Sequence, residues 1–161
     1  MISVGIDVSK GKSTVCFMKP GGEVLQKPFE VLHTMEGILS LVDLIKTYEE
    51  EVRVILEDTG HYHWPVVTLL VEKDVFVCTV NALRMKKYCA QSIRRAKTDK
   101  IDSIRIASYG IAYWSELAQV LPATATYREL KLLARQYYQM TSMLIKAKVN
   151  ISNLLDQVMP N

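Results

Sequence analysis

The chain has 161 residues, about half of them hydrophobic (49%), and a net charge of +3, so it can bury one core and is too ordinary in composition to be disordered or fibrous. No apolar run approaches the roughly 18 residues of a membrane span, and Asp7 and Lys10 near the start argue against a signal peptide. Cys16, Cys78 and Cys89 have no CxxC spacing, which excludes a disulfide framework and a zinc motif of that type. We therefore expect a cytoplasmic protein whose cysteines are buried or half-buried.

The first half of the chain predicts an antiparallel meander followed by alternating helices and strands. Strand-like segments at 2–8, 13–18 and 24–31 follow one another, with the turn Pro20-Gly21-Gly22 before the third. The apolar periodicity then predicts, in order, an amphipathic helix over 34–50, a buried strand over 52–57, a helix near 62–72 and a strand over 75–80.

The basic segment after residue 80 has no clear period up to about Ala96, which favours a partly irregular connection. A helix is expected from Asp99 to about Ala118, with Thr98 as its N-cap. Three strands, a helix, a strand, a helix, a strand and helices is the order of the ribonuclease H-like fold. We therefore predict an α/β protein with a mixed sheet and flanking helices over residues 1–120.

Beyond Leu121-Pro122, a single long helix is predicted to form a coiled coil. Steps of four and three residues meet an apolar side chain each time, and Leu130 extends this seam backward. The seam consists of Leu133, Tyr137, Met140, Leu144, Ala147, Ile151, Leu154 and Val158. We expect residues 121–161 to be a dimerisation helix; the alternative is an amphipathic helix packed on its own domain.

Four carboxylates are the candidate catalytic and metal-binding residues. Asp7 and Glu57 each follow an apolar run, so both are expected at the C-terminal ends of buried strands, where α/β sheets bind ligands. Asp99 and Asp102 are three residues apart, which places them on one face of a helix. Such a cluster of hard oxygen donors suits Mg²⁺ or Mn²⁺, and two such ions can promote phosphodiester cleavage.

The charge is unevenly distributed along the chain. Residues 1–80 carry 7 Lys and Arg against 12 Asp and Glu, whereas residues 81–161 carry 13 against 5. The densest basic run adjoins the Asp99/Asp102 pair, which favours binding of a phosphate backbone over a merely solvated face. The candidate nucleic-acid contacts are Lys10, Arg84, Lys86, Lys87, Arg94, Arg95, Lys97, Lys100 and Arg105.

Three blocks of sequence resemble the DEDD insertion-sequence transposases, a family related to the pilin-gene DNA invertases that includes the bridge-RNA-guided recombinases. The blocks are GIDVSK at 5–10, EDTGHY at 57–62 and RAKTDKIDS at 95–103. The chain departs from the family at Asp58, where Ala is common, and at Ser103, which also replaces Ala. Neither departure removes a candidate ligand.

The resemblance implies a RuvC-like domain whose DEDD acids are Asp7, Glu57, Asp99 and Asp102, followed by a coiled coil used in assembly. It also implies DNA strand cleavage and exchange at insertion-element ends and targets, a guide (bridge) RNA, and association with the nucleoid. Members carry a further C-terminal domain with a nucleophilic serine. We expect that domain to be absent here and the fragment to be inactive without it.

Two other interpretations remain open at this point. The chain could be a non-catalytic RNA- and DNA-binding and dimerisation module. It could also be an actin-like ATPase fragment, because GIDVSK at 5–10 resembles the first phosphate loop of that superfamily, although the other glycine-rich loops are missing.

Overall fold

The computed structural model describes residues 1–58, 62–90, 98–121 and 125–159. The chain separates into two compact units, Met1–Pro122 and Ala123–Asn161, which are treated one at a time. In the described part of the first unit, the strands are β1 (Ile2–Val8), β2 (Lys12–Met18), β3 (Val24–Leu32), β4 (Val52–Asp58) and β5 (Val77–Asn81). The helices are α1 (Met35–Lys46), α2 (Trp64–Glu72), α3 (Ala82–Ala90) and α4 (Asp99–Ala112), with 3-10 turns at Pro20–Gly22 and Trp114–Glu116.

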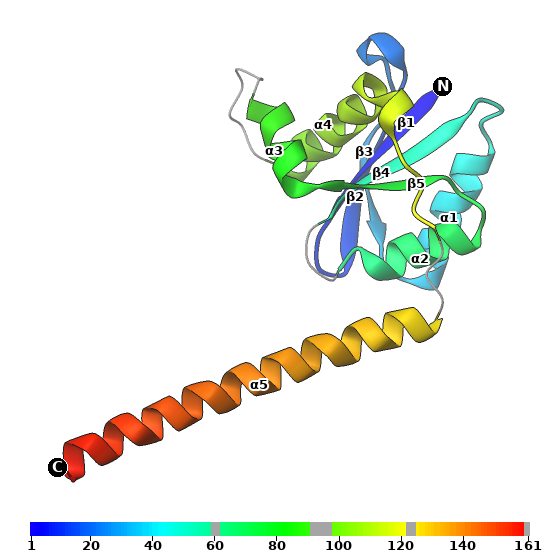
Figure 1. The fold of residues 1–161 in the computed structure, drawn as a ribbon. Coiled ribbons are helices and arrows are strands. Elements are labelled where there is room, and N and C mark those ends of the chain that lie inside the picture. Colours follow the sequence, from blue (N-terminus) through cyan, green and yellow to red (C-terminus); the bar gives the residue numbers. More distant parts are fainter. Residues whose placement is uncertain (59–61, 91–97, 122–124, 160–161) are drawn as a thin grey trace. The chain divides into compact units, whose positions relative to one another are not determined.

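The strands form one mixed sheet in the order β3-β2-β1-β4-β5 (Figure 1). The pairs β3-β2 and β2-β1 are antiparallel, which confirms the predicted meander. The pairs β1-β4 and β4-β5 are parallel, as crossover connections through helices require. The parallel part of the sheet brings the C-terminal ends of β1, β4 and β5 to one edge.

Helices cover both faces of the sheet (Figure 1). Ile2, Val4 and Ile6 of β1 belong to a core that contains buried residues of α1 and α2. On the other face, Ile55 of β4 belongs to a second core with α3 and α4, represented by Met85 and Ile106. Because strand side chains alternate between faces, every second residue of β1 and β4 faces α4.

A glycine brings α4 close to the central strand. A side chain at Gly5 would overlap the backbone carbonyl of Ser103 and the backbone of Ala107. Gly110, two turns after Ser103, would likewise meet Ser3 and Ile55 if it carried a Cβ. The absence of side chains at these two points lets the helix lie directly against β1.

Several element boundaries differ from those predicted. The helix α1 ends at Lys46 instead of continuing to Glu50, since the acidic run of residues 49–51 is unfavourable at the negative end of the helix dipole. The helix α4 ends at Ala112, where the chain turns back and Val120 N donates to Val77 O beside β5. The strand β5 begins at Val77 and includes Asn81.

The helix α3 corrects the prediction of an irregular connection after residue 80. Three of its nine residues, Arg84, Lys86 and Lys87, are basic and exposed, which hides the period. Met85 is nevertheless buried, and Tyr88 packs edge-on against Tyr109 of α4 at 5.3 Å. Asn81 Oδ1 accepts a hydrogen bond from Leu83 N (2.8 Å) at the start of this helix. The remainder of the predicted connection, residues 91–97, lies outside the described residues.

The second unit contains the single helix α5 (Ala125–Val158), 34 residues long. All eight residues of the predicted seam, from Leu133 to Val158, are exposed in the isolated chain. None of the helices in the described ranges, α5 included, has the long apolar stretch that a membrane span requires.

Candidate active site

Asp7 and Glu57 lie at the ends of adjacent parallel strands. Each immediately follows a member of the register pair Ile6 and Leu56, which joins β1 to β4. Residues two apart on a strand lie on the same face of the sheet. Asp7 is two residues after Gly5, which lies against α4, and Glu57 is two residues after Ile55, which packs in the core with α3 and α4. The two carboxylates therefore project from the same face of the sheet, toward the side covered by α4.

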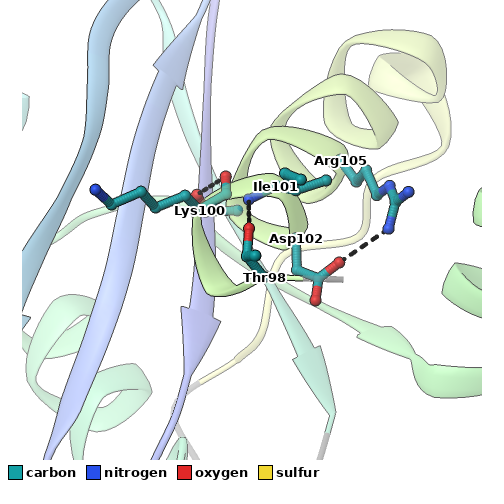
Figure 2. A network of polar contacts seen from close by, with 6 residues as sticks. Thr98, Lys100, Ile101, Asp102 and Arg105 are labelled. Carbon is teal, nitrogen blue, oxygen red and sulfur yellow. Dashed lines mark hydrogen bonds and ion pairs between the residues drawn. The ribbon is translucent and has the colours of Figure 1, made fainter. Parts of the chain in front are cut away.

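The first turn of α4 supplies the other two acids. Thr98 is the N-cap predicted from the sequence, and its Oγ1 accepts a hydrogen bond from Ile101 N at 3.3 Å (Figure 2). Ser103 is buried against β1 and donates its hydroxyl to Lys100 O (2.9 Å). These contacts fix the first turn, with Asp99 and Asp102, over the face from which Asp7 and Glu57 project.

Asp99 lies toward the antiparallel side of the sheet. It lines a surface hollow together with Thr14, Glu30 and Lys100. Thr14 is the register partner of Asp7, so this hollow adjoins the end of β1. Glu30 raises the pKa of Lys12 through a hydrogen bond and its charge, and the charge of Asp99 adds a smaller increase.

Asp102 lies toward α3 and forms an ion pair within its own helix. Its Oδ1 is 3.1 Å from Nη1 of Arg105, and both side chains are half-buried (Figure 2). Burial raises the pKa of the Cys89 thiol; the charge of Arg105 lowers it, and the charges of Asp102 and Glu57 raise it further. Glu57 and the Asp102–Arg105 pair therefore act on the same thiol from β4 and α4.

The four acids fit a divalent-metal site in their chemistry. Carboxylate oxygens are the hard donors that Mg²⁺ and Mn²⁺ take, and water and phosphate complete such a shell. Within the described ranges, however, no three Asp, Glu, His or Cys side chains are close enough to hold a metal ion. The fold brings the acids to one face, and in this conformation Asp102 is engaged by Arg105.

Part of the candidate nucleic-acid surface lies beside these acids. Arg84, Lys86 and Lys87 are exposed on α3, and Lys10 and Lys100 are exposed as well. Arg105 differs from them because it is half-buried against Asp102. Arg94, Arg95 and Lys97 lie outside the described residues.

Two features of this region were missed by the sequence analysis. One is the Asp102–Arg105 pair, because Arg105 was counted only as part of the basic run. The other is the contact between His63 and Asp58, the neighbour of Glu57: His63 is buried, and its Nε2 lies 3.4 Å from Oδ1 of Asp58. This contact joins the end of β4 to the start of α2. The signal available in the sequence was the spacing of five residues between Asp58 and His63, across the end of a predicted strand.

The three cysteines are free thiols, buried at Cys16 and Cys78 and half-buried at Cys89, as expected from the sequence. Burial raises the pKa of Cys16 to about 11, so this thiol stays protonated at neutral pH.

Comparison with known proteins gives a family and a fold. A model of the DEDD transposases of the IS110 type, described as "Transposase", matches residues 4–160. No curated protein sequence matches the chain significantly. Among solved structures, Thermus thermophilus RuvC in complex with a Holliday junction substrate superposes with a TM-score of 0.53 at 13% identity, covering 72% of this chain and 96% of RuvC. A second Thermus thermophilus RuvC structure has a TM-score of 0.53 at 14% identity, covering 75% and 100%. The predicted ribonuclease H-like, RuvC-like fold is thereby confirmed.

Proposed function

Because this chain belongs to the IS110-type DEDD transposase family, we propose that it is the catalytic domain of a DNA transposase or site-specific recombinase that cleaves and exchanges strands with the carboxylates of Asp7, Glu57, Asp99 and Asp102. The observation that carries the proposal is the arrangement of Asp7 and Glu57 on adjacent parallel strand ends, on the face covered by the first turn of α4. Carboxylates gathered in this way repel one another unless a cation offsets their charge.

Each acid has a defined task in this proposal. Asp7, on the central strand β1, would be a ligand of Mg²⁺ or Mn²⁺. Glu57 would bind from the neighbouring strand β4, and Asp99 and Asp102 would bind from the first turn of α4. When bound, the metal pair supplies activation of the attacking oxygen and stabilisation of the leaving oxygen of a phosphodiester. The rigid sheet and the capped α4 hold the carboxylates in place for this work.

The nucleic acid is proposed to lie along α3 and the first turn of α4. The exposed side chains of Arg84, Lys86 and Lys87 provide positive charge beside the acids, and Lys10 and Lys100 extend it toward the end of β1. DNA of the insertion-element ends and target is the substrate, and family membership supports a guide RNA as the second nucleic acid. The RuvC of one matched structure was captured with a Holliday junction, a branched DNA.

Assembly is proposed to use the seam of α5. A 34-residue helix whose seam residues are all exposed needs a partner surface, because a lone helix gains little stability from its own hydrogen bonds. A second copy of the same helix satisfies this need with a self-complementary seam.

A non-catalytic binding and dimerisation module is the competing function. It is favoured by the absence of an assembled three-ligand metal group in the described residues. The actin-like ATPase interpretation is set aside, because the transposase family accounts for residues 4–160.

The two remaining functions are separated by Asp7→Asn, which removes a charge and preserves shape. In a transposition assay with the transposase that carries this chain, we expect the variant to lose strand cleavage and transposition while its circular dichroism spectrum is unchanged. Asp43→Asn, an exposed acid of α1 on the other side of the sheet, is the matched control and should be fully active. Wild-type transposition by Asp7→Asn would establish the non-catalytic module instead.

A further inference from the structure

Asp102 is the acid for which the structure gives a cationic partner on its own helix. Arg105 Nη1 lies 3.1 Å from Asp102 Oδ1, with the two residues one turn apart on α4 (Figure 2). The exposed fractions are 25% for the Asp102 side chain and 19% for Arg105, so water screens this pair less than a surface pair. The contact is a built-in feature of α4, since both residues lie in one regular helix.

An arginine in this position does two things to a neighbouring metal site. It occupies an oxygen that the metal would use, and its fixed positive charge repels a divalent cation nearby. A guanidinium keeps its positive charge throughout the physiological pH range, so this repulsion is not relieved by loss of a proton. For a metal to take the Asp102 carboxylate fully, Arg105 has to move away from it, and an anion near the guanidinium favours that movement.

The other anion is supplied by the substrate. A guanidinium matches a phosphate group in shape and binds it with two parallel hydrogen bonds. A nucleic acid placed along α3 and the start of α4, as in the proposed function, would bring its backbone phosphates to the side of Asp102 that faces Cys89 and α3. The exchange pairs the carboxylate with metal and the guanidinium with phosphate.

We propose that Arg105 is an exchange residue of this site: it holds Asp102 in the metal-free protein and moves to a nucleic-acid phosphate when a divalent metal takes Asp102. This inference rests on the proposed function and adds a regulation to it. Metal and nucleic acid bind cooperatively, and because such coupling is reciprocal, each raises the affinity for the other by the same factor. The metal centre is thus completed only on substrate.

The test is a titration of the chain with Mn²⁺, followed by the electron paramagnetic resonance signal of free Mn²⁺, with and without a short DNA duplex. For the wild type, we expect weak binding alone and clearly tighter binding with the duplex. Arg105→Gln is expected to bind Mn²⁺ more tightly without DNA, by about fivefold or more, and to gain less from the duplex. Equal Mn²⁺ affinity and equal gain in the two proteins would overturn the proposal.

Two matched variants separate the effect of this arginine from charge and folding. Lys46→Gln removes one exposed positive charge from α1, and it should bind Mn²⁺ as the wild type does. Tighter Mn²⁺ binding by this variant would mean that net charge alone explains the effect, and it would overturn the proposal. Arg105→Lys keeps the positive charge and a long side chain, and it should retain weak Mn²⁺ binding without DNA. Tight binding by Arg105→Lys would also contradict the exchange.

Failure of the proposed function gives a different result. Asp102→Asn should weaken Mn²⁺ binding in the presence of the duplex. If no protein binds Mn²⁺ specifically, with or without DNA, the metal centre itself is refuted and the exchange falls with it. If Asp102→Asn weakens binding but Arg105→Gln changes nothing, the metal centre stands and only the exchange is refuted.

Discussion

At the scale of single residues, Gly5 determines how close α4 lies to the strand that ends in Asp7. A methyl group at this position would overlap backbone atoms of Ser103 and Ala107, which a side-chain rotation cannot relieve. We predict that Gly5→Ala lowers the free energy of unfolding by about 1–3 kcal/mol, the usual cost of overpacking a core. Urea denaturation measures it.

The control for this prediction uses the neighbour on the helix. The Gly5→Ala/Ala107→Gly double variant should be no more stable than Gly5→Ala, because the overlap at residue 107 is with the backbone nitrogen and Cα instead of the Ala107 methyl group. Rescue by the second substitution, or a single variant as stable as the wild type, would show that α4 has room to move away from β1.

Residue identity alone could not reveal the state of Asp102. The sequence predicted correctly that Asp7 ends a strand and that Asp99 and Asp102 open a helix capped by Thr98. It could not predict that Arg105 engages Asp102, because an Asp and an Arg three residues apart also occur as solvated pairs. Partial burial, which is a property of the tertiary structure, distinguishes this pair.

At the scale of elements, the N-cap of α4 connects helix stability with metal binding. Thr98→Ala removes the acceptor for Ile101 N and is predicted to cost about 1 kcal/mol, as cap deletions do. It should also weaken Mn²⁺ binding in the presence of DNA, since the first turn carries Asp99 and Asp102. Urea denaturation and the Mn²⁺ titration measure the two effects.

Thr34 provides the matched control for the cap. Its side chain caps α1 in the same way and accepts a hydrogen bond from Gly37 N at 3.1 Å. The first turn of α1 contains no candidate metal ligand. Thr34→Ala should therefore lose similar stability and keep its Mn²⁺ affinity. Equal loss of metal affinity in both variants would mean that α4 does not position the acids.

The helix α3 carries the prediction for nucleic-acid binding. Lys86 and Lys87 are exposed there, beside the candidate acids. Replacing both with Ala should weaken binding of a DNA duplex and reduce the slope of log affinity against log salt by about 0.9 for each phosphate that the variant no longer neutralises. Fluorescence anisotropy at several salt concentrations measures the slope.

Lys46→Ala/Lys73→Ala removes the same charge from the acidic half of the chain and should leave the slope unchanged. An identical reduction in the two double variants would indicate that only net charge matters and that α3 is not the contact surface.

The same helix marks the limit of prediction from sequence at this scale. The order of strands and helices was predictable because the apolar runs and turns are regular. The basic helix α3 was not, because only one narrow stripe, including Met85 and Tyr88, is apolar enough to reveal a period. The end of α4 depends on Arg53, whose guanidinium stacks on Phe76 and Trp114 and bonds to Trp114 O, a contact between distant segments.

At the scale of the whole molecule, the account predicts self-association through α5. Ile151 is a residue of the exposed seam, whereas Asn153 lies on the opposite side of the helix from Ile151. A glutamate in the seam would bury a charge in a helix pair, so Ile151→Glu should dissociate the oligomer, and Asn153→Glu should not. Analytical ultracentrifugation measures both. A monomeric wild type, or an oligomer unaffected by Ile151→Glu, would contradict this use of the seam.

The candidate metal site is a property of the whole molecule, because its four acids come from β1, β4 and α4, which only folding brings to one face of the sheet. The most direct test is an anomalous difference map of crystals grown with Mn²⁺ and a DNA duplex, for the wild type and for Asp102→Asn. The account predicts manganese peaks among the carboxylates of Asp7, Glu57, Asp99 and Asp102, with the peaks weakened or missing in the variant. Ordered DNA without manganese at these four acids would contradict it.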